Sequence, residues 1–92
     1  MSPPKAPAGH FTILYFAAVA DYTKKPHETF SAPLKAVELP STLEAKYPGI
    51  TSKILESCAF TVNLDYVDLD ESDDTVIQEG DEVAVIPPVS SG

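Results

Sequence analysis

The chain has 92 residues, of which 43% are hydrophobic and 22% are charged, and its formal net charge at pH 7 is −8. A chain of this length forms one small domain with a simple core, and the composition excludes a collagenous or wholly disordered protein. The negative charge argues against nucleic acid or an anionic membrane surface as partner, because both would repel the chain.

The N-terminal third predicts a leader followed by a pair of strands. The segment MSPPKAPAG is rich in proline, so we expect residues 1–9 to form a disordered leader and structure to begin near His10. From Phe11 to Phe16, β-branched and aromatic residues occupy both faces, which predicts a strand that is central in its sheet or covered on both sides. The segment AAVADYTKK permits a short helical turn that ends before Pro26. A second strand over residues 28–31 would then pair with the first.

One main helix is predicted in the segment LKAVELPSTLEAKYPG. Its apolar residues recur at spacings of three and four and share one helix face: Ala36, Leu39, Leu43 and Tyr47. Pro40 limits where the helix can begin, because proline lacks an amide proton and is tolerated only in the first turn. Either the helix begins near Val37, or Ser41 caps a shorter helix with Glu44 in the capping-box position. In both cases the helix ends at residues 47–49.

The second half of the chain predicts one more helical turn and three strands. TSKILES gives the turn, and CAFTVN alternates as a strand over residues 58–63. LDYVDLDESDD predicts a short strand or turn and then an acidic loop, and a tight turn at residues 79–81 leads to the last strand, Val83 to Ile86. This order predicts an α+β fold over residues 10–88, with one mixed sheet wrapped over one main helix.

Charge is distributed unevenly along the chain. All six basic residues are lysines at or before Lys53, whereas residues 65–82 contain nine acidic residues and no basic residue. One end of the fold should therefore be electronegative, which serves solubility or orients docking onto a basic partner surface. The segment DLDESDD lacks the central glycine and the glutamate of a calcium loop, so we expect a solvated acidic loop.

Cys58 and the two histidines are further candidates for chemistry. No histidine, lysine or arginine adjoins Cys58 in the sequence, which favours a buried apolar role over a persulfide-carrying nucleophile. His10 and His27 lack the spacing of metal ligands, so no metal site is expected. With one cysteine, no secretory signal pattern and no apolar run long enough for a bilayer, we expect a reducing, cytoplasmic location.

The segment GDEVAVIPPVSSG joins an apolar strand to a stiffened exit. Pro87 and Pro88 each fix φ at about −65° and favour extended backbone before them, so residues 89–92 should leave the domain as an extended tail. Such a tail loses little entropy when a partner captures it. Gly92 has no Cβ, so a partner can approach its carboxylate closely. In the alternative interpretation, the prolines only prevent edge pairing and the tail has no function.

Four segments, in this order, carry a family resemblance: ILYFA, LEAKYPG, FTVNLDYV and GDEVAVIPPVSSG. Together they resemble the small, ubiquitin-like subunit of molybdopterin synthase, a family of sulfur carriers with the β-grasp fold. The resemblance covers about 80 residues and omits only the leader. The family usually closes with two glycines, whereas here Ser91 precedes Gly92 and adds one small side chain.

The resemblance implies a role for Gly92 and two partner proteins. An E1-like enzyme would adenylate Gly92 with ATP and magnesium and then convert it to a thiocarboxylate, while the chain itself binds no cofactor stably. The thiocarboxylate would enter the large synthase subunit, in a heterotetramer, and donate sulfur to cyclic pyranopterin monophosphate. The chain would be a co-substrate more than a catalyst. The expected partner contacts are Phe16, Pro87, Pro88, Val89, Ser90 and Ser91, with burial in the core as the alternative for Phe16.

Two other functions remain open. Sulfur carriers for thiamine synthesis or tRNA thiolation share the fold and the terminal glycine, but they generally lack the Pro-Pro-Val exit. A ubiquitin-like binding module would share the fold without any sulfur chemistry.

Overall fold

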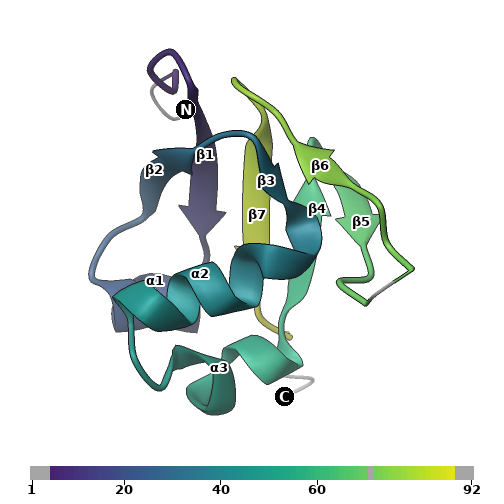
Figure 1. Ribbon diagram of the computed structural model, residues 1–92. Helices are drawn as coiled ribbons and strands as arrows, with labels where there is room; N and C mark the ends of the chain where they lie inside the picture. The colour runs from purple at the N-terminus through teal and green to yellow at the C-terminus, as the bar shows by residue number, and fades with distance from the viewer. Residues whose placement is uncertain (1–4, 71, 89–92) are drawn as a thin grey trace.

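The computed structural model describes residues 5–70 and 72–88 (Figure 1). Five strands form the main sheet in the order β2-β1-β7-β4-β5. Their bounds are β1 (His10–Tyr15), β2 (His27–Ser31), β4 (Ala59–Val62), β5 (Asp65–Val67) and β7 (Glu82–Ile86). The β1 and β7 strands run parallel, whereas the other neighbouring pairs are antiparallel. The predicted α+β fold with a mixed sheet is therefore confirmed.

The β1 strand lies inside the sheet, between β2 and β7. Phe11, Ile13 and Tyr15 are buried in the core, and Thr12 on the opposite face is only 5% exposed. The apolar character of both faces therefore correctly predicted an interior strand. Because β1 and β7 are parallel, they end at the same edge of the sheet, at the bottom of Figure 1.

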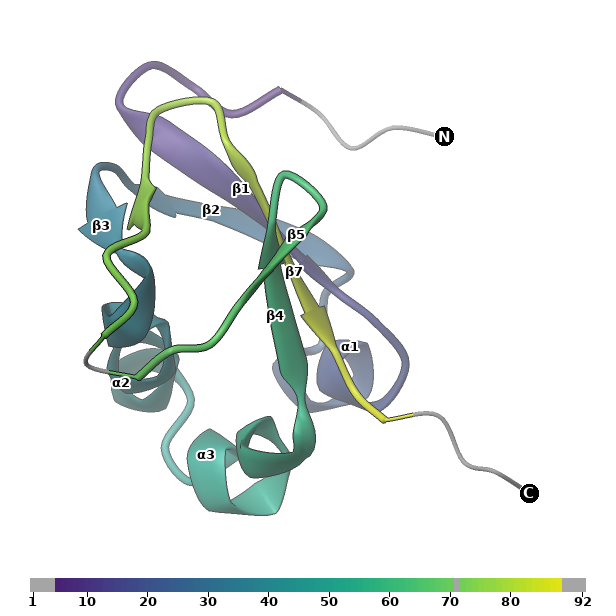
Figure 2. The same cartoon turned by 90° about the vertical axis from the view of Figure 1, so that its right-hand side faces the viewer.

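The helices lie mainly on one face of the sheet, and Figure 2 shows α2 and α3 together on that side. Their bounds are α1 (Ala18–Thr23), α2 (Leu39–Lys46) and α3 (Ile50–Lys53), with 3₁₀ turns η1 (Ala36–Glu38) and η2 (Leu55–Ser57). Side chains from α2 and α3 pack against the sheet in one apolar core, in which Leu39, Leu43 and Ile50 are fully buried. The helical turns predicted on either side of the main helix are confirmed.

The start of α2 decides between the two predicted helix beginnings. The 3₁₀ turn η1 leads directly into α2, and Pro40 occupies the first turn of α2, where its missing amide proton costs no hydrogen bond. The helical path therefore begins near Val37. The capping-box alternative is wrong, because the Ser41 hydroxyl donates to the Glu38 carbonyl (3.0 Å) from inside the helix.

Glu44 binds the backbone of the following turn instead. Its carboxylate accepts hydrogen bonds from the amides of Gly49 (2.6 Å) and Thr51 (3.0 Å). These bonds hold the pKa of Glu44 below its usual value, with the Gly49 amide as the largest cause. Glu44 thereby joins the end of α2 to the start of α3.

A second, two-stranded sheet was not predicted. In it β3 (Leu34–Lys35) pairs antiparallel with β6 (Val76–Ile77), and the Ala36 amide donates to the Thr75 carbonyl (2.9 Å). Ile77 is fully buried. The end of the acidic loop is therefore attached to the segment that leads into α2.

The last residues of the predicted leader contact the domain. The His10 amide donates to the Pro7 carbonyl, the Gly9 amide donates to the Glu79 carboxylate, and the Ala32 amide donates to the Gly9 carbonyl (2.8 Å). Residues 7–9 are therefore hydrogen-bonded parts of the fold, whereas residues 1–4 lie outside the described residues. In the described part of the chain, no helix is long and apolar enough to cross a membrane.

Candidate functional site

The base of the predicted tail is β7, the middle strand of the main sheet. This strand pairs with β1 along one edge and with β4 along the other, and Val83 and Val85 are fully buried in the core. Pro87 is half-buried and Pro88 is exposed. The chain thus leaves a strand that is fixed on both sides. The predicted tail residues Val89, Ser90, Ser91 and Gly92 lie outside the described residues, so their roles stay predictions.

The face of the main sheet that points away from the helices carries an apolar row. Cross-strand partners share a face, and the register aligns Leu14 with Ala84, Ala84 with Thr61, and Thr61 with Tyr66. Ala84 and Thr61, in the middle of this row, are only 9% and 5% exposed. Tyr66 is 74% exposed. We call this row, with Phe16 and Ile86 beside it, the outer face.

Phe16 lies at the edge of the sheet where β1 and β7 end. Its exposed fraction is 45%, so the alternative that placed it in the core is wrong. Tyr15, the last residue of β1, is aligned with Val85 of β7, so Phe16 and Ile86 each follow the last aligned pair at the same edge of the sheet. Phe16, Pro87 and Pro88 therefore lie at one end of the outer face, as a shared partner contact requires, and contact itself stays a prediction.

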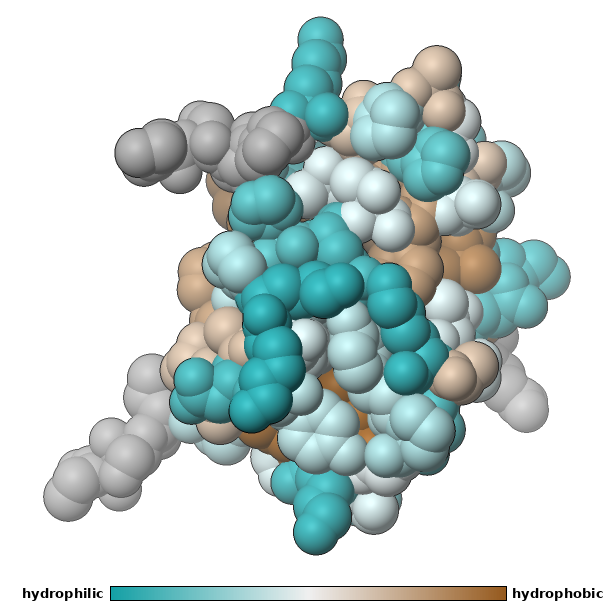
Figure 3. Space-filling view, turned by 90° about the vertical axis from the view of Figure 1, so that its left-hand side faces the viewer, coloured by the Kyte–Doolittle hydropathy of each residue, from teal (hydrophilic) through white to brown (hydrophobic). Residues whose placement is uncertain are grey.

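Tyr66 is a candidate contact that sequence analysis missed. The short strand around it was recognised only as a strand or turn, and aromatic residues are common in all strands. Tyr66 and the half-buried Val67 are neighbours in the strand and therefore point to opposite faces of the sheet. This alternation was the one feature of the sequence that could have placed Tyr66 on the exposed face. Figure 3 shows the molecule from the β2 side, where hydrophilic residues cover much of the surface and apolar residues are seen at the left-hand margin, at the upper right and in the lower centre.

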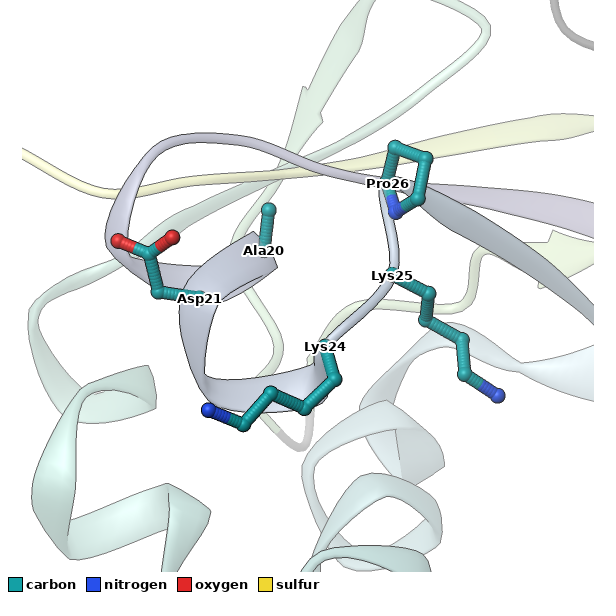
Figure 4. Close-up of a pocket in the computed structure, with 5 residues that line it drawn as sticks. All are labelled: Ala20, Asp21, Lys24, Lys25 and Pro26. Atoms are coloured by element: carbon teal, nitrogen blue, oxygen red, sulfur yellow. The ribbon is translucent and has the colours of Figure 1, made fainter.

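A shallow hollow of about 500 Å³ lies between α1 and the start of β2. It is lined by Ala20, Asp21, Lys24, Lys25 and Pro26. Figure 4 shows the charged ends of Asp21, Lys24 and Lys25 pointing in different directions. A small-molecule site needs polar groups that converge on the ligand, so this hollow does not have the form of a catalytic or cofactor site.

The acidic loop uses part of its charge to hold its own backbone. Asp73 accepts hydrogen bonds from the amides of Thr75 and Asp68 (both 2.8 Å), and Asp70 accepts one from the Ser72 amide (3.0 Å). Hydrogen bonds from Thr75, and then from Asp68, lower the pKa of Asp73 to about 2. Within residues 5–70 and 72–88, no three side chains of histidine, cysteine, aspartate or glutamate are grouped as metal ligands.

Cys58 has the environment of a packed side chain. It lies just before β4, which begins one residue later than the predicted strand, and its thiol donates to the Ile54 carbonyl (3.3 Å). Burial raises the pKa of the Cys58 thiol, which lowers the fraction of reactive thiolate at neutral pH. This environment favours the apolar role over that of a persulfide carrier. His10 contacts the Ala8 carbonyl through Nδ1 (3.0 Å), and His27 lies in β2.

Comparison with known proteins agrees with this arrangement. A family model described as the ThiS family matches residues 13–92, from β1 to the end of the tail. The chain belongs to this family. The family model covers nearly the whole fold of this ThiS-family chain. The matched residues include Phe16, the Pro-Pro exit and Gly92.

Curated relatives of this ThiS-family chain share one name. A protein of Pyrenophora tritici-repentis is 59% identical over 93 residues and covers all of both chains. A protein of Homo sapiens is 40% identical over 82 residues, which cover 87% of this chain and 91% of the human protein. Both are named molybdopterin synthase sulfur carrier subunit.

Solved structures confirm the ubiquitin-like β-grasp fold of this ThiS-family chain. Small archaeal modifier protein 1 of Methanosarcina acetivorans has a TM-score of 0.72 at 22% identity, over 95% of this chain and all of that one. A second match is a chain in the structure of the protein–protein complex of subunits 1 and 2 of the molybdopterin-converting factor of Helicobacter pylori. Its TM-score is 0.65 at 22% identity, and the match covers 90% of the present chain and 99% of the Helicobacter pylori chain.

Proposed function

We propose that this chain is the sulfur carrier subunit of a molybdopterin synthase, and that Gly92 carries the sulfur as a thiocarboxylate. The family match and the shared name of the relatives support this function. The observation that carries the proposal is the position of the Pro-Pro exit. It follows a strand that is paired on both sides, and it lies at the edge of the sheet where β1 also ends and Phe16 is exposed.

Activation of Gly92 requires a leaving group, because a carboxylate is a poor electrophile. In the proposed reaction, a carboxylate oxygen attacks the α-phosphorus of ATP on an E1-like enzyme with magnesium, and pyrophosphate leaves. Hydrosulfide from the sulfur donor then adds to the acyl carbon and AMP leaves, which gives the thiocarboxylate. ATP and magnesium are used by the activating enzyme, and the carrier holds no cofactor of its own.

Delivery would take place inside the large synthase subunit. The thiocarboxylate sulfur displaces an oxygen substituent from a carbon of cyclic pyranopterin monophosphate, so that a carbon–sulfur bond replaces a carbon–oxygen bond, and water then cleaves the bond between the acyl carbon and sulfur. The sulfur stays on the pterin and the Gly92 carboxylate is restored. Two deliveries by two carriers supply both dithiolene sulfurs, which fits a heterotetramer. In this scheme the carrier is a co-substrate and the large subunit holds the catalytic groups.

The outer face suits the docking step. Phe16, Ile86 and Tyr66 offer apolar surface, and burial of such surface drives association. Pro87 and Pro88 keep the exit extended, which lowers the entropy lost on capture. We also propose that the carrier acts in the cytosol. The name of the relatives favours molybdopterin synthesis over thiamine synthesis or tRNA thiolation.

The test is a two-stage reconstitution. The chain is incubated with an E1-like enzyme, ATP, magnesium and a sulfur donor, and its intact mass is measured. We expect one oxygen to be replaced by sulfur, and we expect the loaded chain to form molybdopterin with the large subunit and cyclic pyranopterin monophosphate. The matched control carries one alanine after Gly92 and should fold equally but accept no sulfur.

Two outcomes would contradict the proposal. Binding of the large subunit without any oxygen-to-sulfur replacement would identify a mere binding module. Sulfur loading without transfer to the pterin, with the large subunit bound, would point to a carrier of another pathway.

A further inference from the structure

A buried carboxylate lies under the edge of the sheet from which the chain exits. The Glu28 side chain, on β2, is only 7% exposed. Its Oε2 accepts hydrogen bonds from the hydroxyls of Tyr15 (2.5 Å) and Tyr47 (2.6 Å). Its Oε1 binds the ammonium of Lys46 and lies 3.5 Å from that of Lys25. We call these five residues the Glu28 cluster.

The charge of the Glu28 carboxylate is balanced by hydrogen-bond donors and ammonium groups within the cluster. Burial by itself raises the pKa of Glu28, but hydrogen bonds from Lys46, Tyr15 and Tyr47 outweigh this effect and hold the pKa below its usual value. Burial and then Glu28 raise the pKa of both tyrosines. At neutral pH the cluster therefore contains a carboxylate and two neutral hydroxyl donors. Two donors for each oxygen fill the acceptor positions of a carboxylate.

The donors come from separate elements that meet at this edge. Tyr15 is the last residue of β1, Lys46 is the last residue of α2 with Tyr47 directly after it, and Lys25 lies between α1 and β2. The Tyr15 amide donates to the Pro26 carbonyl (2.9 Å). The cluster thus connects α2 and the turn after α1 to the end of β1.

Phe16 is held directly beside this cluster. It follows Tyr15 in sequence, and its carbonyl accepts a hydrogen bond from the Val19 amide (3.0 Å). Tyr15 is also aligned with Val85 of β7, one residue before Ile86. The cluster therefore lies on the helix side of the sheet, behind the end of the outer face that Phe16 and the Pro-Pro exit share.

Stability alone does not explain this arrangement. Replacing a buried ion-pair cluster by apolar side chains of similar volume is often neutral or stabilising. Hydrogen bonds, unlike apolar contacts, also fix the direction in which neighbouring groups approach. We infer that Glu28 is a positioning residue for docking, which orients Phe16 and the exit edge of the sheet for capture by the large subunit. The inference rests on the proposed function.

The test replaces the cluster by apolar groups of similar size. The variant combines Glu28→Met, Tyr15→Phe, Tyr47→Phe and Lys46→Met. Three quantities are measured: the midpoint of thermal unfolding, the Kd for the large subunit, and the hydrogen-exchange rate of the Val19 amide. The matched control is Val62→Ala, which truncates a core residue at the opposite end of the sheet.

Docking and stability should separate in these two variants. We expect the apolar variant to keep its unfolding midpoint and to bind the large subunit about tenfold more weakly, an effect within the range of coupling energies between contacting residues. We also expect its Val19 amide hydrogen to exchange with solvent faster. We expect Val62→Ala to unfold at lower temperature and to keep its affinity. If the apolar variant does not fold, Tyr15→Phe and Tyr47→Phe, which each remove one hydroxyl, should show the same separation.

Unchanged affinity and unchanged Val19 exchange in the folded variants would overturn the inference, as would an affinity that falls only in step with stability. If the unaltered chain does not bind the large subunit, the proposed function fails. The exchange rate of Val19 then still decides whether the cluster positions Phe16, with faster exchange supporting it and an unchanged rate refuting it.

Discussion

Replacing Phe16 by alanine should weaken docking to the large subunit by an amount that follows from its exposure. The Phe16 side chain is 45% exposed in the free chain. A large aromatic residue can bury about 200 Å², so about 90 Å² remains for a partner to cover. At about 25 cal/mol per Å² this area corresponds to about 2 kcal/mol, or about a 30-fold higher Kd.

Isothermal titration calorimetry with the large subunit measures this change. The buried half of Phe16 also contributes to the stability of the fold. The titration is therefore carried out well below the unfolding temperatures of Phe16→Ala and of the unaltered chain. Leu64→Ala is the matched control, because Leu64 is 84% exposed but lies in the β4–β5 turn, at the end of the sheet away from the exit. If Phe16→Ala binds as tightly as the unaltered chain, or if Leu64→Ala loses as much affinity, the assigned docking face is wrong.

Three further predictions concern stability. Leu43 is fully buried, so Leu43→Ala should lower the free energy of unfolding by about 2 to 5 kcal/mol in urea titrations; an unchanged value would contradict its place in the core. Leu64 has a φ of 74°, so Leu64→Gly should raise that free energy by about 1 kcal/mol, and a decrease would show that the Leu64 side chain makes stabilising contacts. Hydrogen bonds from Thr75 and Asp68 lower the pKa of Asp73 to about 2, compared with about 3.9 in unfolded chains. The stabilising effect of Asp73 is therefore complete above this unfolded-state value and is lost as the pH falls towards 2. Over this pH range the thermal unfolding midpoint of Asp73→Asn should fall less steeply than that of the unaltered chain. An identical slope in both proteins would show that Asp73 does not cause the loss of stability in acid.

The elements that follow from local pattern could be predicted from the sequence. Apolar residues on both faces marked β1 as an interior strand, and the spacing of Leu39 and Leu43 marked the buried face of α2. The start of α2 could not be decided, because Pro40 is tolerated both in the first turn of the longer helix and just before the Ser41 cap of the shorter one. The β3–β6 sheet has only two residues in each strand, which is too short for any period to be visible.

The candidate site was predictable only in part. The two prolines identified the exit from β7 through their fixed backbone geometry. The exposure of Phe16 and Tyr66 depends on what the rest of the fold covers, and the sequence does not contain that information locally. The same holds for the Glu28 cluster, whose donors Tyr15, Lys46 and Tyr47 lie 13, 18 and 19 residues from Glu28. Such contacts have no characteristic spacing.

The pairing of β7 along both edges has a mechanical consequence. A pull on Pro88 along the strand axis loads the hydrogen bonds to β1 and β4 in shear, so that they resist the force together instead of opening one after another. The pull is therefore shared by two neighbouring strands and by the buried Val83 and Val85. Under the proposed function, insertion of the chain end into the large subunit and its withdrawal can then leave the domain folded.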